Sequence, residues 1–183
     1  MVRAPGSKQA SLAWQPRSVR AILRKLSVDF SPDQDGTPAM DLQWLGINAF
    51  RLTQGGTTVL LDPYVSRQTT PLCKPELVRR CFPAAAGVVI SHSHWDHLAD
   101  AHVVAAHTGA VVFGSRTTVN VCRSFGIPDG QLVELDDGDL AERAGVSVRF
   151  LRSAHMPLPD GTVAYPGCYE APPCRPPQAA PEY

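Results

Sequence analysis

The segment Ser91–Leu98 restricts what this chain can become more than any other stretch. It reads Ser-His-Ser-His-Trp-Asp-His-Leu and holds three of the chain's six histidines. It directly follows the apolar run Gly87–Ile90, which is typical of a buried strand. Neutral imidazoles and carboxylates are ligands that zinc accepts in proteins. The segment therefore predicts a metal site at the end of a strand.

The spacing of the four candidate ligands divides them into two pairs. His92 and His94 are separated by one residue at the strand end, so both side chains can reach one ion. Asp96 and His97 lie past the turn, where a helix begins, and this favours a second ion beside the first. Two alternatives stay open: the segment is a polar loop that binds no metal, or Asp96 caps the helix.

Two further side chains are predicted to stand at strand ends. The strands expected over 42–45, 49–52 and 57–62 form a meander that stops at Pro63, because proline cannot donate to a central ladder. This places Asp62 where it can reach an active-site loop, although it can also serve as a turn residue. His155 follows the strand expected over 146–151, either as a third imidazole ligand or as a capping or turn residue.

The order of the remaining patterns indicates an α/β fold. Strands alternate with helices, and such folds place their chemistry along one edge of the sheet. We expect His102 and His107 to be surface residues of a helix rather than ligands. The further predicted elements are strands over 84–90, 110–114 and 131–135, and helices over 75–81, 96–107 and 115–125.

Composition restricts the class of protein. A chain of 183 residues with 44% apolar content suits one domain with tails, and its zero net charge predicts no nucleic-acid partner. The five cysteines lack zinc-knuckle spacing and are interpreted as free thiols in a reducing compartment, which favours a cytoplasmic location. The chain has no apolar run of membrane-spanning length.

Three segments are predicted. Residues 1–40 form a basic arm and linker, residues 41–157 form the domain, and residues 158–183 form a proline-rich tail that is extended or disordered. Within the arm, residues 16–26 fit a short basic amphipathic helix. Such a helix can pack on the domain, or it can make peripheral contact with an anionic membrane.

The domain resembles the metallo-β-lactamase superfamily. The resemblance covers residues 41–157 and is strongest toward the branch of sugar-phosphate lactonases and N-acylphosphatidylethanolamine-type phospholipases D. The residues that carry it are the strand Trp44-Leu45-Gly46, the strand end Leu61-Asp62-Pro63, the motif His92-x-His94-x-Asp96-His97-Leu98, and His155 after a later strand.

The resemblance implies an αβ/βα sandwich and a site for one or two zinc ions. By position, His92, His94 and His155 would bind the first ion, and Asp96 and His97 the second. Asp62 would orient a ligand, and Asp62 and Asp96 together would orient the nucleophile. The implied activity is zinc-dependent hydrolysis, in which a metal-bound hydroxide attacks an ester, lactone, amide or phosphodiester of a small-molecule or lipid substrate.

The chain also departs from the family pattern. The family has a bridging carboxylate and another histidine after the His155 position, whereas Asp160 and Glu170 stand in the wrong context and no histidine follows His155. We therefore expect only the first αβ half of the sandwich, either as a fragment or as a half-domain that forms a homo-oligomer. The alternative function is a truncated, inactive metal-binding remnant or an interaction module.

Overall fold

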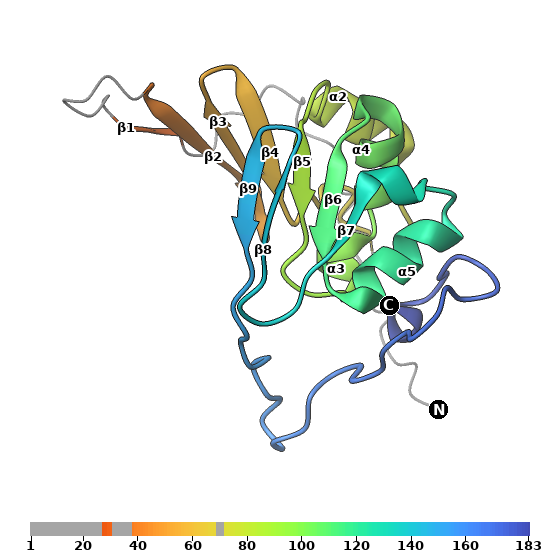
Figure 1. Ribbon diagram of the computed structural model, residues 1–183. Helices are drawn as coiled ribbons and strands as arrows, with labels where there is room; N and C mark the ends of the chain where they lie inside the picture. Colours follow the sequence, from red (N-terminus) through yellow and green to blue (C-terminus); the bar gives the residue numbers. More distant parts are fainter. Residues whose placement is uncertain (1–26, 31–37, 69–71) are drawn as a thin grey trace, which may run out of the picture.

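A mixed seven-stranded sheet is the centre of the computed structural model, which describes residues 27–30, 38–68 and 72–183 (Figure 1). Its strands follow one another in chain order across the sheet. They are β1 (Ser27–Phe30), β2 (Met40–Gly46), β3 (Ala49–Gln54), β4 (Thr57–Leu61), β5 (Gly87–Val89), β6 (Val111–Gly114) and β7 (Leu132–Glu134).

The sheet changes from antiparallel to parallel at β4. Strands β1 to β4 pair antiparallel, as expected for a meander with short connections. Strands β4 to β7 pair parallel, because the connections after β4, β5 and β6 return through helices or long loops. The carboxyl ends of β4, β5 and β6 consequently meet at one edge, and the predicted α/β architecture is confirmed.

Helices cover one face of this sheet. They are α2 (Pro75–Cys81), α3 (Trp95–Leu98), α4 (Ala101–Thr108) and α5 (Arg116–Ser124). The main core lies between these helices and the strands, and its largest fully buried side chains include Tyr64, Phe82, Leu60, Ile90 and Leu98. Ser115 caps α5 as predicted, with its Oγ accepting a hydrogen bond from the Thr118 N–H at 3.4 Å.

The prediction of a single helix over 96–107 is wrong in one respect, because the structure has two helices there, α3 and α4. The division falls at Ala99 and Asp100, both fully buried. There the Asp100 carboxylate accepts hydrogen bonds from the backbone N–H groups of Val65 and Ser66, each at 2.8 Å. Buried backbone N–H groups require acceptors. The break between the two helices places the Asp100 carboxylate where it accepts from the loop after β4.

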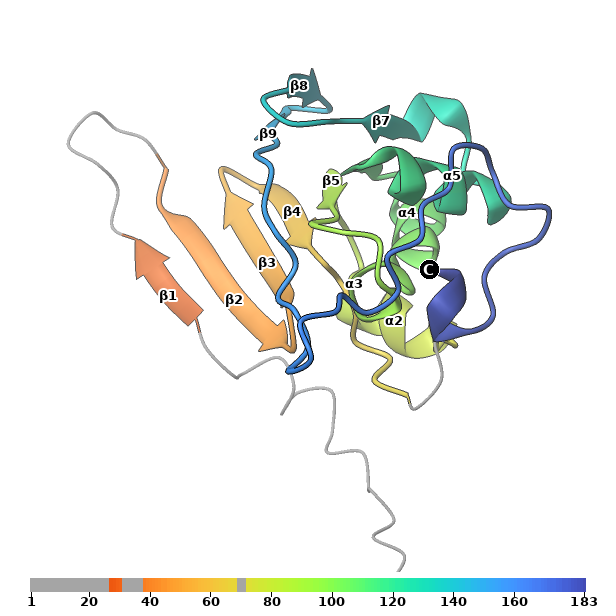
Figure 2. The ribbon, with the colours of Figure 1, turned by 90° about the horizontal axis from the view of Figure 1, so that it is seen from below.

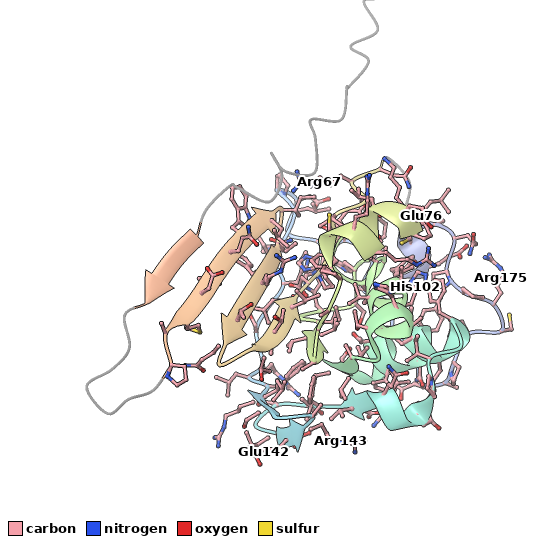
Figure 3. All side chains as sticks on the ribbon, turned by 90° about the horizontal axis from the view of Figure 1, so that it is seen from above. Arg67, Glu76, His102, Glu142, Arg143 and Arg175 are labelled. Atoms are coloured by element: carbon pink, nitrogen blue, oxygen red, sulfur yellow. The ribbon has the colours of Figure 1, made fainter. Side chains whose placement is uncertain are left out.

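The prediction that His102 lies on the surface is wrong. The residue is half-buried on the helical side of the sheet (Figure 3), where its ring stacks on Phe125 with centroids 3.8 Å apart and planes at 12°. Its Nδ1 is buried without a hydrogen-bond partner. Burial lowers the pKa of His102 to about 4, so the ring is neutral at pH 7. His107 is exposed, as predicted.

A hairpin covers part of the opposite face of the sheet (Figures 1 and 2). It consists of β8 (Leu140–Arg143), which the sequence analysis did not predict, and β9 (Val146–Arg149). A second apolar cluster joins its Val146 to Val111 and Phe113 of β6 and to Leu135. The described part of the chain thus forms a helical layer, a sheet and a partial third layer.

The proline-rich segment 158–183 has little regular structure beyond the 3₁₀ turn η2 (Ala180–Glu182), but it is held against α5 (Figure 2). The Tyr169 N–H donates to Thr117 Oγ1 at 3.0 Å, and Asn120 Nδ2 donates to the Tyr169 carbonyl at 2.8 Å. Tyr183 at the end of the chain is 4% exposed. These contacts give the segment a defined path along α5, and its role as a separate tail stays a prediction.

Some expectations are not addressed by the described residues. The predicted amphipathic helix over 16–26 lies outside the described residues. Strand β1 shows that the sheet begins before residue 41, the predicted start of the domain.

All five cysteines are free thiols, as expected. None of the described helices has the length and apolar character needed to cross a bilayer. The segment boundaries, the half-sandwich, self-association and the cytoplasmic location remain predictions.

Candidate metal centre

The candidate site lies where the parallel strands β4, β5 and β6 end. Asp62 follows β4, the segment Ser91–His94 follows β5, and Ser115 follows β6. The Asp62 N–H donates to the Val89 carbonyl at 3.0 Å, and the Ile90 N–H donates to the Phe113 carbonyl at 2.9 Å, so the ladder continues up to the site. Loops at the carboxyl edge of parallel strands are the usual location of chemistry in α/β folds.

Three of the predicted ligands converge there. His92, His94 and His155 each offer a ring nitrogen, and these atoms all lie within 4.8 Å of one another. The His92 and His94 ring centroids are 4.7 Å apart, and His155 lies 5.1 Å from His92 and 4.6 Å from His94. Two chain segments that are distant in sequence thus build one cluster, and a cavity of about 270 Å³ opens beside it.

Each histidine of this cluster has one ring nitrogen occupied by a neighbour. Ser91 Oγ lies 3.1 Å from His92 Nδ1, the Tyr165 carbonyl lies 3.3 Å from His94 Nε2, and the Met156 carbonyl lies 2.8 Å from His155 Nδ1. A carbonyl oxygen only accepts, so the nitrogens of His94 and His155 that face carbonyls carry the proton. The other nitrogen of each of these rings keeps its lone pair for a metal.

His92 passes the most direct test of fit to a metal ion. Its Nε2 is buried and has no hydrogen-bond partner, which is costly unless a bound group satisfies it. Burial lowers the pKa of His92 to about 4, and the neighbouring His97 and His94 add to the shift. A neutral imidazole with an unpartnered nitrogen beside two others is a suitable ligand set for a divalent ion such as zinc.

Asp62 supports the cluster from behind and does not form an Asx turn. Its Oδ1 accepts from the Ser91 N–H at 2.7 Å, and its Oδ2 accepts from Ser91 Oγ at 2.7 Å and from His97 Nδ1 at 2.8 Å. Since Ser91 donates its proton to Asp62, its oxygen is left to accept from His92 Nδ1. The carboxylate therefore acts on His92 through Ser91 and leaves His92 Nε2 free.

The second predicted pair is not part of the three-histidine group. Asp96 lies in the first turn of α3 and not at its N-cap, which is His94. Its Oδ2 is 3.8 Å from His97 Nε2, beyond hydrogen-bond distance. His97 Nε2 instead has Asn48 Nδ2 at 2.9 Å. The structure therefore brings Asp96 and His97 near the cluster, with the ring of His97 packed 3.9 Å from that of His92.

Two supporting residues were not predicted from the sequence. Asn48, in the turn between β2 and β3, contacts His97, and Asp100 holds the loop that follows Asp62. The Asp100 Oδ1 also accepts from Ser66 Oγ at 2.6 Å. Burial raises the pKa of Asp100, and these hydrogen bonds oppose that effect. The sequence did contain a signal for Asp100. It is an acid two residues past Leu98 in an otherwise apolar helical pattern, and a buried acid there indicates a structural contact.

Neither acidic residue after His155 reaches the site. Asp160 accepts from the Thr162 N–H at 2.9 Å and from Thr162 Oγ1 at 2.7 Å. Glu170 pairs with Arg116 at 2.8 Å on the outer side of α5. Both carboxylates are exposed, and both serve local contacts. This agrees with the expectation that they stand in the wrong context to bridge two ions.

Fold and site together define an α/β protein in which three histidines, suited to hold a metal ion, gather at the carboxyl edge of a mixed sheet. A family model described as a beta-lactamase superfamily domain matches residues 41–167. The chain therefore belongs to the metallo-β-lactamase superfamily, and the family resemblance seen in the sequence is confirmed.

Relatives of this chain are named as metal-dependent hydrolases. A UPF0173 metal-dependent hydrolase of Pyrobaculum arsenaticum is 27% identical over 140 residues, covering 70% of this chain and 61% of the relative. One of Roseiflexus sp. strain RS-1 is 31% identical over 116 residues, covering 62% of this chain and 47% of the relative. The chain thus matches about half to three fifths of the length of these relatives.

Among solved structures, a metallo hydrolase of the archaeon Ignicoccus hospitalis is similar to this chain. It is 28% identical, with a TM-score of 0.44, and the match covers 56% of this chain and 42% of that one.

Proposed function

We propose that this chain acts as a zinc-dependent hydrolase of ester, lactone, amide or phosphodiester bonds in a small-molecule substrate, with zinc held by His92, His94 and His155. The observation that carries the proposal is the convergence of three ring nitrogens within 4.8 Å. Three protein ligands with a position left for water or substrate are the usual arrangement of a catalytic zinc. The names of the relatives, which refer to metal-dependent hydrolysis, support the same activity.

A bound zinc ion supplies Lewis acidity, which activates water and polarises the oxygen of the bond to be cleaved. The chain's own residues orient the reactants. Asp62 holds Ser91 and His97 through three hydrogen bonds and so sets the direction of His92. Asp96 is the carboxylate beside the cluster that keeps access to solvent, with 37% of its side chain exposed. We assign it the role of accepting a proton from the attacking water.

The cavity beside the histidines is where we place the substrate. It measures about 270 Å³ and, besides the histidines, is lined by residues that include Val163, Tyr165, Ser115 and Thr117. The mixed apolar and hydroxyl lining suits a small ester or lactone with a polar group. Contact of residues 16–26 with a lipid surface stays a separate prediction, which vesicle sedimentation with and without residues 1–26 would test.

Metal binding without hydrolysis is the second candidate function. It is favoured by the engagement of Asp160 and Glu170 in other contacts. The test is zinc content by mass spectrometry together with hydrolysis of a panel of ester, lactone, amide and phosphodiester substrates. Hydrolysis that His94→Ala abolishes supports the hydrolase. Stoichiometric zinc with no hydrolysis of any class supports the second candidate, and absence of bound zinc contradicts both.

A further inference from the structure

The imidazole of His97 already has a partner at each of its two nitrogens. Nδ1 is 2.8 Å from Asp62 Oδ2, a carboxylate oxygen that can only accept, so the proton of a neutral ring lies on Nδ1. Nε2 then holds the lone pair, and Asn48 Nδ2 lies 2.9 Å from it. An amide nitrogen donates, so Asn48 fills the lone pair that a metal ligand would need. His92 differs, because its Nε2 has no partner.

Asn48 is held in this position by its turn. The Trp44 indole Nε1 donates to the Ile47 carbonyl at 3.0 Å, and Arg67 donates to the Leu45 carbonyl. Gly46 has φ +101°, and a side chain there would collide with the Arg67 guanidinium. A turn with two side-chain donors on its carbonyls and a glycine at a φ that strains other residues presents Asn48 in one direction.

The surrounding carboxylates do not supply the ligands that a second ion needs. Asp62 is occupied by three donors, and Asp160 and Glu170 are engaged away from the site. Of the described residues next to the site, Asp96 and His97 remain, and these are two protein ligands for an ion beside an already charged one. Among the residues the structure describes, the His92, His94 and His155 group is the one set of three or more potential ligands gathered closely enough to hold an ion.

We infer that the site takes a single tightly bound ion, and that Asn48 is a positioning residue that keeps His97 as the partner of Asp62 and not as a metal ligand. The inference rests on the proposed zinc site. His97 then supports the chain of contacts from Asp62 through Ser91 to His92. The metal centre is accordingly mononuclear, with Asp96 free to act on water.

Zinc titration of the full chain, followed by competition with a chromophoric chelator, tests the inference. We expect one equivalent to bind tightly to the wild-type protein, with any second equivalent much weaker. Asn48→Ala removes the competing donor and should tighten the second equivalent about fivefold, the factor equivalent to one hydrogen bond of roughly 1 kcal/mol. The double variant Asn48→Ala/His97→Ala should lose that gain. Gln54→Ala, whose exposed side-chain amide donates to the Pro38 carbonyl at the opposite end of β3 from Asn48, is the control.

Ring ¹⁵N spectra of His97 report its tautomer and whether Nε2 binds metal, and a loss of stability alone would not change either. In the zinc-loaded wild-type protein we expect the Nδ1-protonated tautomer, with Nε2 hydrogen-bonded and not metal-bound. Two tight equivalents in the wild-type protein, one of them lost in His97→Ala, would overturn the inference and leave the proposed function intact. An Asn48→Ala protein with an unchanged second equivalent would also overturn it. Absence of any tight equivalent would instead contradict the proposed function.

Discussion

Asp62 Oδ2 accepts a hydrogen bond from His97 Nδ1 at 2.8 Å, and this contact joins the end of β4 to helix α3 across the candidate site. Asp62 reaches it with φ +41°, a conformation that aspartate and asparagine tolerate better than most residues. The same carboxylate holds Ser91, so one buried acid fixes both the strand-end loop and the first turn after it. The geometry of the histidine cluster depends on this acid although it offers no ligand itself.

Asp62→Asn tests that dependence. Asparagine keeps the backbone conformation and one acceptor, but it places an amide where Ser91 Oγ and His97 Nδ1 need an acceptor. We expect zinc affinity to fall roughly 10-fold to 100-fold, the usual effect of losing a residue that orients a ligand, with the fold retained. Chelator competition and circular dichroism measure the two effects. Asp160→Asn is the control, and equal losses in both variants would contradict the role given to Asp62.

His155→Ala tests whether the third ligand comes from the segment after β9. His155 is exposed and interacts with the fold mainly through its two histidine neighbours, so the substitution should cost little stability, within roughly 0.5 kcal/mol. Zinc affinity should drop by at least two orders of magnitude, because two imidazoles hold zinc poorly. His107→Ala, which changes another exposed histidine on α4, should leave affinity unchanged. Undiminished zinc binding by His155→Ala would remove it from the ligand set.

Gly114→Ala tests the packing behind the site. A Cβ at Gly114 would lie 2.5 Å from Thr118 Cγ2, and Thr118 Oγ1 lies 2.9 Å from Ser93 Oγ in the loop between the first two histidines. Overpacking of this kind destabilises by about 1–3 kcal/mol. Gly130→Ala is the matched control, because nothing lies within 4 Å of its added methyl. Chemical denaturation of both variants gives the comparison, and equal stabilities would show that Thr118 can move aside.

His102 predicts an acid-dependent loss of stability. Its pKa is lowered to about 4 from 6.5, so between these values the unfolded chain binds a proton that the folded chain does not. Stability therefore falls as pH decreases from 6.5 to 4, by up to roughly 3 kcal/mol from this residue. His102→Gln should flatten this part of the profile, whereas exposed His107→Gln should leave it unchanged. Urea midpoints measured across this pH range give the slopes, and parallel profiles for wild type and His102→Gln would refute the prediction.

The order of elements could be inferred from the chain alone because each has a strong local cause. Pro75 begins α2, Ser115 caps α5, and the apolar run before Ser91 forms β5, all as predicted. Predictions from local sequence patterns were wrong where a contact with a residue distant in sequence determined the structure. The break before α4 follows from the hydrogen bonds that Asp100 makes to the loop after β4, and His102 is half-buried because Phe125 returns to stack on it.

The sequence determined which residue types the candidate metal site contains, since a histidine cluster after a buried strand is typical of metal binding. Only the tertiary structure decided which of those residues meet, because His155 reaches His92 and His94 through the sheet edge and the segment after β9. It also decided what His97 does. Asn48, whose amide contacts His97 Nε2, lies 49 residues earlier in the chain. The local sequence pattern around His97 cannot indicate a contact with so distant a residue.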